Sequence, residues 1–138
     1  MSCVFCDIVD GRATAAHVMS DTHAVAFLDK TPLFHGHVLV VPRQHVETLH
    51  DLELSEVGPL FERVQRVARA VVDATGAEGT FVAMNNKVSQ SVAHLHVHVV
   101  PRKKKDGLRG FFWPRTKYAS PEQMQETAGA IARALSAT

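Results

Sequence analysis

The chain has 138 residues, which is enough for one domain with its own hydrophobic core and no need of disulfide bridges. Hydrophobic residues make up 46% and charged residues 21%, as in ordinary globular proteins. A formal net charge of +1 gives no electrostatic reason to expect binding to nucleic acid or to a membrane surface. No apolar run approaches the ~20 residues of a membrane span, and no basic start precedes an apolar stretch. We therefore expect a cytoplasmic protein.

The first half of the chain predicts three strands. Residues 17–20 and 23–29 are rich in strand formers and flank a turn-like Asp-Thr pair. Residues 36–41 are nearly all apolar after His37, which predicts a central strand, and Pro42 is expected to end it.

Residues 55–75 predict a long amphipathic helix, because apolar side chains recur there at helical spacing. Ser55 suits the N-cap and Gly76 suits the stop. Pro59 is compatible with this helix if it lies in the first turn. Further strands are expected at about 79–85 and 93–100.

The C-terminal part predicts one more helix. Ser120-Pro121 combines an N-cap with proline at the first helical position, and the helix should reach about Leu135. Before it come three lysines, at 103–105, and the aromatic run Phe111-Phe112-Trp113. We interpret the lysines either as a solvated turn or as a contact for the additional phosphates of a polyphosphate chain. The aromatics are read as helix docking, a contact across a dimer, or a lid over a nucleotide.

Together these elements predict an α+β fold: an antiparallel sheet of about five strands, one long helix and a C-terminal helix. We expect a single domain over residues 1–138, with a core at about 3–102 and an extension at 103–138.

The run from His94 to Val100 alternates imidazole with aliphatic side chains. On a strand, this alternation places His94, His96 and His98 on one face and turns the aliphatic residues to the core. The spacing is compatible with a histidine nucleophile for phosphoryl transfer, with a three-histidine metal site, or with a polar groove. Gln90 and Ser91 favour the first, because they offer phosphate donors just upstream, and a zinc hydrolase would want a nearby acidic group.

Residues 90–102 closely resemble the signature of the histidine triad (HIT) superfamily. The likeness extends upstream to Phe27-Leu28-Asp29 and to residues 36–45, so that it spans roughly residues 3–102. It points to a Hint- or Fhit-like nucleotide hydrolase or transferase.

The resemblance implies roles for individual residues. His96 would be the nucleophile that forms a covalent nucleotidyl-histidine, and His98 would contact the phosphate and protonate the leaving group. His37 would line the phosphate site, and Asp29 would hold the ribose hydroxyls. The predicted catalytic residues are thus His96, His98, His37 and Ser91, and the predicted nucleotide-binding residues are Phe5, Ile8, Phe27, Leu28, Asp29, Asn85, Gln90, Ser91 and His98.

Two features of this sequence limit what the resemblance implies for its residues. Phe5, Ile8, Phe27 and Leu28 would form the apolar slot for the base, but plain core packing is the alternative for all four. For Phe27 the two interpretations are about even. The stretch 85–89 is shorter than usual in the family, and Ser89 stands where a glycine is common, so that the backbone's approach to the phosphates is expected to differ.

The Cys3-x-x-Cys6 pair is by itself weak evidence of a metal site, and two reduced thiols packed as small hydrophobes are the alternative. Some bacterial members of the superfamily hold zinc with such a pair. That resemblance implies a structural Zn²⁺ ligated by Cys3, Cys6, His45 and His94, within the preferences of this ion.

The leading hypothesis is therefore a hydrolase or transferase acting on a nucleoside 5′-phosphate derivative. The substrate would be a purine nucleoside phosphoramidate or a dinucleoside polyphosphate, with Mg²⁺ accompanying the latter. One alternative is a nucleotide-binding regulatory module with little catalysis, and another is a metal-dependent hydrolase with three histidine ligands. The resemblance also implies a homodimer.

Overall fold

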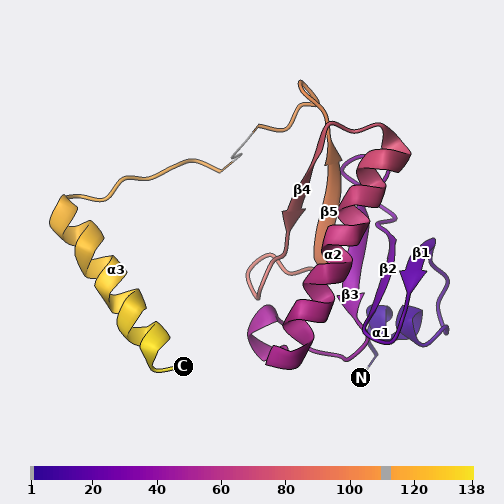
Figure 1. The fold of residues 1–138 in the computed structure, drawn as a ribbon, viewed down its shortest axis with the longest axis horizontal. Coiled ribbons are helices and arrows are strands. Elements are labelled where there is room, and N and C mark those ends of the chain that lie inside the picture. The colour runs from indigo at the N-terminus through magenta and orange to yellow at the C-terminus, as the bar shows by residue number, and fades with distance from the viewer. Residues whose placement is uncertain (1, 110–112) are drawn as a thin grey trace. The chain divides into compact units, whose positions relative to one another are not determined.

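We analysed a computed structural model that describes residues 2–109 and 113–138. The chain divides into two compact units, one ending at Asp106 and the other beginning at Gly107. The first unit holds a five-stranded antiparallel sheet with strand order β1-β2-β3-β5-β4 and the long helix α2 (Figure 1). The predicted α+β architecture is confirmed.

The elements of the first unit follow one another in a simple order. They are α1 (Val4–Val9), β1 (His17–Ser20), β2 (Ala24–Leu28), β3 (Val38–Pro42), the short 3-10 helix η1 (Leu49–Asp51), α2 (Leu54–Thr75), β4 (Gly79–Ala83) and β5 (Val97–Arg102). The second unit contains α3 (Pro121–Ser136). In the described part of the chain, no helix has the length and apolarity needed to cross a bilayer.

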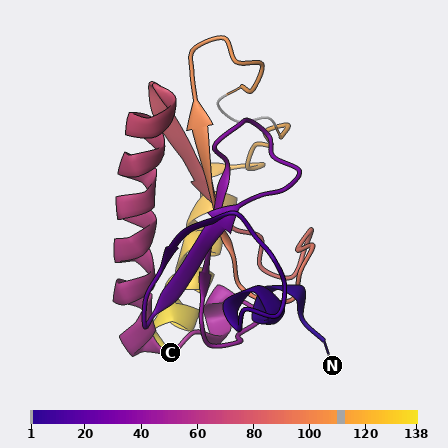
Figure 2. The same ribbon diagram turned by 90° about the vertical axis from the view of Figure 1, so that its right-hand side faces the viewer.

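Helix α2 covers one face of the sheet (Figure 2). Its buried residues Leu60, Val64, Val67 and Val71 recur every three or four positions, which aligns them on one side of a helix. They pack against alternate residues of β2, β3 and β5, and Leu95 joins the same cluster. The prediction that Leu95, Val97 and Val99 turn to the core is confirmed.

The opposite face of the sheet carries a second, smaller core, on which the short helix α1 lies (Figure 2). Phe5 and Ile8 of α1 pack there against Val25 and Phe27 of β2 and against β3. Because strand side chains alternate between faces, His96 and His98 belong to this α1 face when Val97 and Val99 face α2. The two cores thus leave the histidines beside α1 and away from α2.

Several predicted strand boundaries differ from those in the structure. Strand β5 begins at Val97, so that residues 94–96 precede it, because its pairing with β3 stops at the Val40–Val97 pair. Strand β3 begins at Val38, later than predicted, and ends at Pro42, which pairs with Ala24.

The start of α2 also differs from the prediction. The helix begins at Leu54 with Glu53 as N-cap, because the Glu56 amide bonds the Glu53 carbonyl. Ser55 is therefore inside the helix, and Pro59 lies beyond its first turn. Gly76 ends the helix in the left-handed conformation, as predicted.

The second unit is described on its own. Ser120 caps α3 by accepting a hydrogen bond from the Gln123 amide at 3.0 Å, as its sequence predicts. None of the helix residues is buried within the described structure. Of the predicted aromatic run, Phe111 and Phe112 lie outside the described residues, and Trp113 is 57% exposed.

Candidate active site

A pocket of about 530 Å³ opens on the α1 face of the sheet. It brings together residues from α1, the end of β2 and the segment before β5. Eight predicted site residues line it: Phe5, Ile8, Phe27, Leu28, Asp29, Ser91, His96 and His98. Residues far apart in the sequence thus meet around one cavity, as the predicted site requires.

The apolar side of the pocket is also part of the core. Phe5, Ile8 and Phe27 are buried, whereas Leu28 is 41% exposed. The Phe5 ring meets Phe27 edge to face at 5.4 Å and His96 at 5.1 Å between ring centroids. Phe27 is therefore a core residue that also lines the pocket, and its contact with a base stays a prediction.

His96 is nearly buried, with 3% of its surface exposed, and its ring is oriented by the backbone of His94. Its Nδ1 lies 2.8 Å from the carbonyl oxygen of His94. A carbonyl only accepts hydrogen bonds, so Nδ1 must carry the ring proton. The lone pair of the neutral ring is then on Nε2, which is the form that a nucleophilic imidazole needs.

His37 and His98 form a second, connected pair. The Leu33 amide donates to Nδ1 of His37 at 3.1 Å, so this neutral ring carries its proton on Nε2. Nε2 of His37 in turn donates to Nδ1 of His98 at 2.9 Å. Since Nδ1 of His98 accepts, its proton is on Nε2. A backbone amide thus sets the tautomers of both rings.

Burial keeps this pair neutral. Together with the neighbouring His96 and His37, it lowers the pKa of His98 to about 4. Burial also lowers the pKa of His37, although the Asp29 carboxylate acts in the opposite direction. One Asp29 oxygen, Oδ2, lies 3.7 Å from Nε2 of His37.

Asp29 and His37 lie at the two ends of one loop, and hydrogen bonds within this loop hold them in place. The other Asp29 oxygen, Oδ1, accepts the Thr31 amide at 3.0 Å, while the Asp29 amide donates to the His37 carbonyl at 2.9 Å. Gly36 has a φ of +101°, and a Cβ there would lie 2.7 Å from Cγ2 of Thr75, at the end of α2. Only glycine fits this close approach, which sets where the chain turns into β3.

Asn85 and Gln90 are not among the residues that line the pocket. Asn85 donates to the Ser89 carbonyl at 3.2 Å, and the Gln90 side chain accepts from the Lys87 amide and donates to the Glu47 carbonyl. These two amides hold the loop that leads to Ser91. Ser89 has a φ of 60°, so the position where the family commonly has glycine keeps the backbone conformation that glycine favours.

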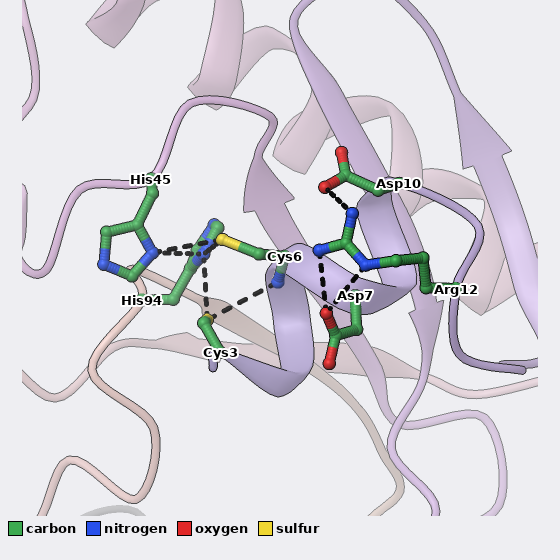
Figure 3. Close-up of polar contacts among 7 residues, drawn as sticks. All are labelled: Cys3, Cys6, Asp7, Asp10, Arg12, His45 and His94. Atoms are coloured by element: carbon green, nitrogen blue, oxygen red, sulfur yellow. Dashed lines mark hydrogen bonds and ion pairs between the residues drawn. The ribbon is translucent and has the colours of Figure 1, made fainter. Parts of the chain in front are cut away.

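Four side chains form a compact cluster at the N-terminus of α1 (Figure 3). The ligand atoms of Cys3, Cys6, His45 and His94 all lie within 4.8 Å of one another. Nδ1 of His94 is 3.6 Å from each sulfur and 3.2 Å from Nδ1 of His45. Tetrahedral Zn²⁺ with bonds of about 2.0–2.3 Å holds its ligand atoms about 3.3–3.8 Å apart. The cluster has nearly this spacing.

The protonation of His94 also suits a metal ligand. Its Nε2 lies 2.9 Å from the carbonyl oxygen of Pro42 and must donate to it, which leaves the lone pair on Nδ1, towards the cluster. Burial raises the pKa of the Cys6 thiol to about 11, with Cys3 adding to the effect. A divalent cation would hold the two sulfurs as thiolates in place of these protons. A second group, Asp29 with His37 and His98, is also close enough for an ion, but a hydrogen bond already joins its two rings.

Comparison with known proteins places this site in a family. The HIT domain family matches residues 10–105. The chain belongs to this family. A crystal structure of a HIT family member from Bacillus subtilis is 34% identical, with a TM-score of 0.87 over 96% of each chain. A zinc-bound histidine triad family protein from Mycobacterium smegmatis is 35% identical, with a TM-score of 0.74 over 100% of this chain and 99% of that one. Adenosine 5′-monophosphoramidase hnt1 of Schizosaccharomyces pombe is 32% identical over 91% of this chain and 92% of its own.

The HIT site contains groups that the sequence did not single out. The Leu33 amide and the His94 carbonyl set the ring tautomers, and a backbone group carries no signal in the residue type. Thr31 lines the pocket without belonging to a recognised motif, and Val92 lines it as a residue of the signature that had no predicted role.

Proposed function

We propose that this HIT domain hydrolyses nucleoside 5′-phosphoramidates, in which the phosphate of a purine nucleotide is bonded to an amine nitrogen. The observation that carries the proposal is the His94 carbonyl, which holds the proton of His96 on Nδ1 and leaves Nε2 as the free nitrogen beside a nucleotide-sized pocket. The relationship to an adenosine 5′-monophosphoramidase supports the P–N bond as the one that is cleaved.

In the first step, Nε2 of His96 attacks the phosphorus, and the bond to the amine nitrogen breaks. The electron pair of that bond stays on the amine, which takes a proton from Nε2 of His98. Because the phosphate anion raises the pKa of a neighbouring imidazole, nucleotide and proton bind together at His98. In this state the Nε2 proton of His37 passes to Nδ1 of His98, and Nδ1 of His37 takes up the arriving proton and releases the Leu33 amide.

In the second step, water attacks the phosphorus of the nucleotidyl-His96. The P–N bond to the ring breaks, and the proton of water returns to His98, which restores the starting enzyme with release of the nucleotide and the amine. Ser91, at the rim of the same pocket, is placed to donate a hydrogen bond to the phosphate or the leaving group.

The other half of the pocket would hold the nucleoside. Phe5 and Phe27 offer an apolar surface for the base. The Asp29 carboxylate lies at the pocket wall, where its oxygens can accept hydrogen bonds from the ribose hydroxyls. We assign Asn85 and Gln90 to positioning of the loop before Ser91, since their amides are used within the chain.

Replacing His96 tests this proposal. His96→Ala should abolish turnover of an adenosine phosphoramidate while AMP still binds, because the base and ribose contacts remain. Wild-type protein denatured in base during turnover should carry one adenylyl group on His96, detected by mass spectrometry. An active His96→Ala enzyme would refute the mechanism. Tight AMP binding with no turnover of phosphoramidates or dinucleoside polyphosphates would support the binding module instead.

We also propose that the four-residue cluster holds a structural Zn²⁺ ion. The spacing of its ligand atoms and the zinc-bound relative support this assignment. The ion would tie α1 to the segment before β5, with no part in the chemistry on phosphorus. Protein purified without chelator should contain about one zinc per chain, and Cys6→Ser should lower this content.

A homodimer remains part of the proposal. Strand β4 is at one edge of the sheet, and its Val82 side chain is 42% exposed. An edge strand of this kind is available for pairing with a second copy. Light scattering in solution measures the oligomeric state, and an Arg residue in place of Val82 should shift it to the monomer.

A further inference from the structure

The nucleophile is not held by the strand that its motif predicts. Strand β5 begins at Val97, and its last described pair with β3 is Val40–Val97. His96 therefore lies one residue outside the hydrogen-bonded ladder. Something other than the sheet must hold the backbone of residues 94–96.

Hydrogen bonds from residues 94–95 to the end of β3 and to the segment after it take the place of the ladder. The His94 ring donates through Nε2 to the Pro42 carbonyl at 2.9 Å, and the Leu95 amide donates to the Val46 carbonyl at 2.7 Å. The remaining contact is made by the cluster itself, in which Nδ1 of His94 faces Nδ1 of His45 at 3.2 Å. Because the proton of the neutral His94 ring is on Nε2, its Nδ1 offers only a lone pair, which must face either a metal ion or a proton carried by the exposed His45 or a thiol.

His94 connects this cluster directly to His96. Its side chain belongs to the metal-binding group, and its carbonyl oxygen accepts the Nδ1 proton of His96 at 2.8 Å. The residue is completely buried, so its ring and its carbonyl move together. Any shift of the His94 ring displaces the group that selects the tautomer of His96.

We propose that His94 is a positioning residue through which occupancy of the metal cluster sets the tautomer, and thereby the nucleophilicity, of His96. The inference rests on the proposed function. Metal loading would then act as an on-switch for nucleotidylation in this chain, beyond its contribution to stability. Without the ion, Nδ1 of His94 exchanges a metal bond for weaker hydrogen bonds from the exposed His45 or the thiols. The 94–96 backbone then relaxes, and His96 divides between its two neutral tautomers.

Nucleotide binding should respond differently from chemistry. Phe5 and Ile8 are held by packing against β2 and β3, and Asp29 is held by its own loop. These groups keep their places when the cluster loses its ion. The expected signature is a loss in the nucleotidylation rate with an unchanged dissociation constant for AMP.

The test uses His45→Ala, because the His45 side chain is exposed and its removal leaves both cores intact. The ¹⁵N resonances of the His96 ring report the tautomer directly, at one fixed pH. Zinc-loaded wild type should show the Nδ1-protonated form alone. Zinc-free wild type and His45→Ala should show both forms, with nucleotidylation slower by about 10–100-fold, as for other groups that orient a functional side chain around a metal.

Two control variants separate positioning from stability. His45→Cys keeps a zinc-binding side chain and should restore both the single tautomer and the rate. Val64→Ala weakens the α2 core without changing a ligand of the cluster, and should leave the tautomer of His96 unchanged. Folding of each variant is followed by the dispersion of its backbone amide resonances.

The proposal is overturned if folded, zinc-free protein keeps the single Nδ1-protonated tautomer of His96 and the full nucleotidylation rate. A loss of rate with an unchanged tautomer also contradicts it. If zinc-loaded wild type forms no nucleotidyl-His96 at all, the proposed function fails, while the comparison of tautomers still decides the positioning role.

Discussion

Nε2 of His37 lies 2.9 Å from Nδ1 of His98, and the direction of this hydrogen bond is set by the Leu33 amide on the far side of His37. The bond fixes the His98 proton on Nε2, the nitrogen that remains for the substrate. Two residues 61 positions apart thus act as one unit. The sequence places both in motifs of the family, but only the structure gives the direction of the bond between them.

Loss of the His98 side chain should depend on the leaving group. His98→Ala should slow hydrolysis of an alkylamine phosphoramidate by about 10²–10⁴-fold, which is the usual contribution of a general acid. An AMP ester of an acidic phenol needs no protonation, so its hydrolysis should change little. The measurement compares single-turnover rates for the two substrates. An equal loss for both would mean that His98 holds the phosphate and does not protonate the leaving group.

The depressed pKa of His98 also predicts acid sensitivity. Burial, with His96 and His37 nearby, lowers the pKa of His98 to about 4, whereas an unfolded histidine titrates near 6.5. Between these values the unfolded chain binds more protons, so stability falls as the pH drops from about 6.5 towards 4. His98 alone contributes a slope of at most about 1.4 kcal/mol per pH unit.

Replacing His98 by Asn should flatten this dependence. Urea denaturation at several pH values between the two limits, on zinc-loaded protein of both forms, measures the slope. The Asp29 carboxylate opposes the shift at His98 and remains in the variant. Identical slopes for wild type and His98→Asn would show that the acid sensitivity arises elsewhere, for example at the metal ligands.

The pattern of alternation predicted the histidine face better than it predicted the strand. Leu95 is fully buried in the α2 core, and Phe5 meets both His94 and His96 from the other side, although neither histidine is in the ladder. The alternation records which side chains are apolar and therefore which side is buried. It does not record whether the neighbouring strand is paired, and here β3 continues to Pro42 while its pairing with β5 stops at Val40–Val97.

Other parts of the site left no pattern to read. Helix α1 has only six residues, too few for a helical period to show, yet it supplies Phe5, Ile8 and Cys6. Asn85 and Gln90 have suitable side chains for phosphate, but their partners are backbone groups of a loop that the sequence does not position. Helix α2, by contrast, has 22 residues and a clear period, and only its first residues were assigned wrongly.

Asp29 should distinguish ribose from deoxyribose. If its carboxylate accepts hydrogen bonds from the ribose hydroxyls, Asp29→Asn should weaken binding of AMP by about 1.5–3 kcal/mol, the range for bonds to charged groups. Binding of 2′-deoxy-AMP should weaken much less, because one of the bonds is already absent. Titration calorimetry of AMP and 2′-deoxy-AMP with wild type and with Asp29→Asn gives the four binding free energies of this double-change cycle. Additive effects would argue against a contact between Asp29 and the 2′-hydroxyl.

Gly36 and Gly58 form a matched pair for testing the turn before His37. Alanine at Gly36 would adopt a φ of +101° and place its Cβ 2.7 Å from Cγ2 of Thr75, so Gly36→Ala should destabilise by about 1–3 kcal/mol. Gly58 lies in α2 with nothing within 4 Å of an added Cβ, so Gly58→Ala should stabilise by about 0.5–1 kcal/mol. Urea denaturation of each variant gives the sign.

Gly36→Ala also tests whether this turn affects the chemistry. Displacing Gly36 moves His37, so Gly36→Ala should slow turnover of the amine substrate more than that of the phenol ester, in the manner of His98→Ala. Thr75→Ser removes Cγ2 but keeps the hydroxyl that donates to the Val71 carbonyl. Adding it to Gly36→Ala should recover part of both losses, since the clash is relieved while the backbone strain remains. Full activity of Gly36→Ala would mean that the His37–His98 bond tolerates movement of this turn.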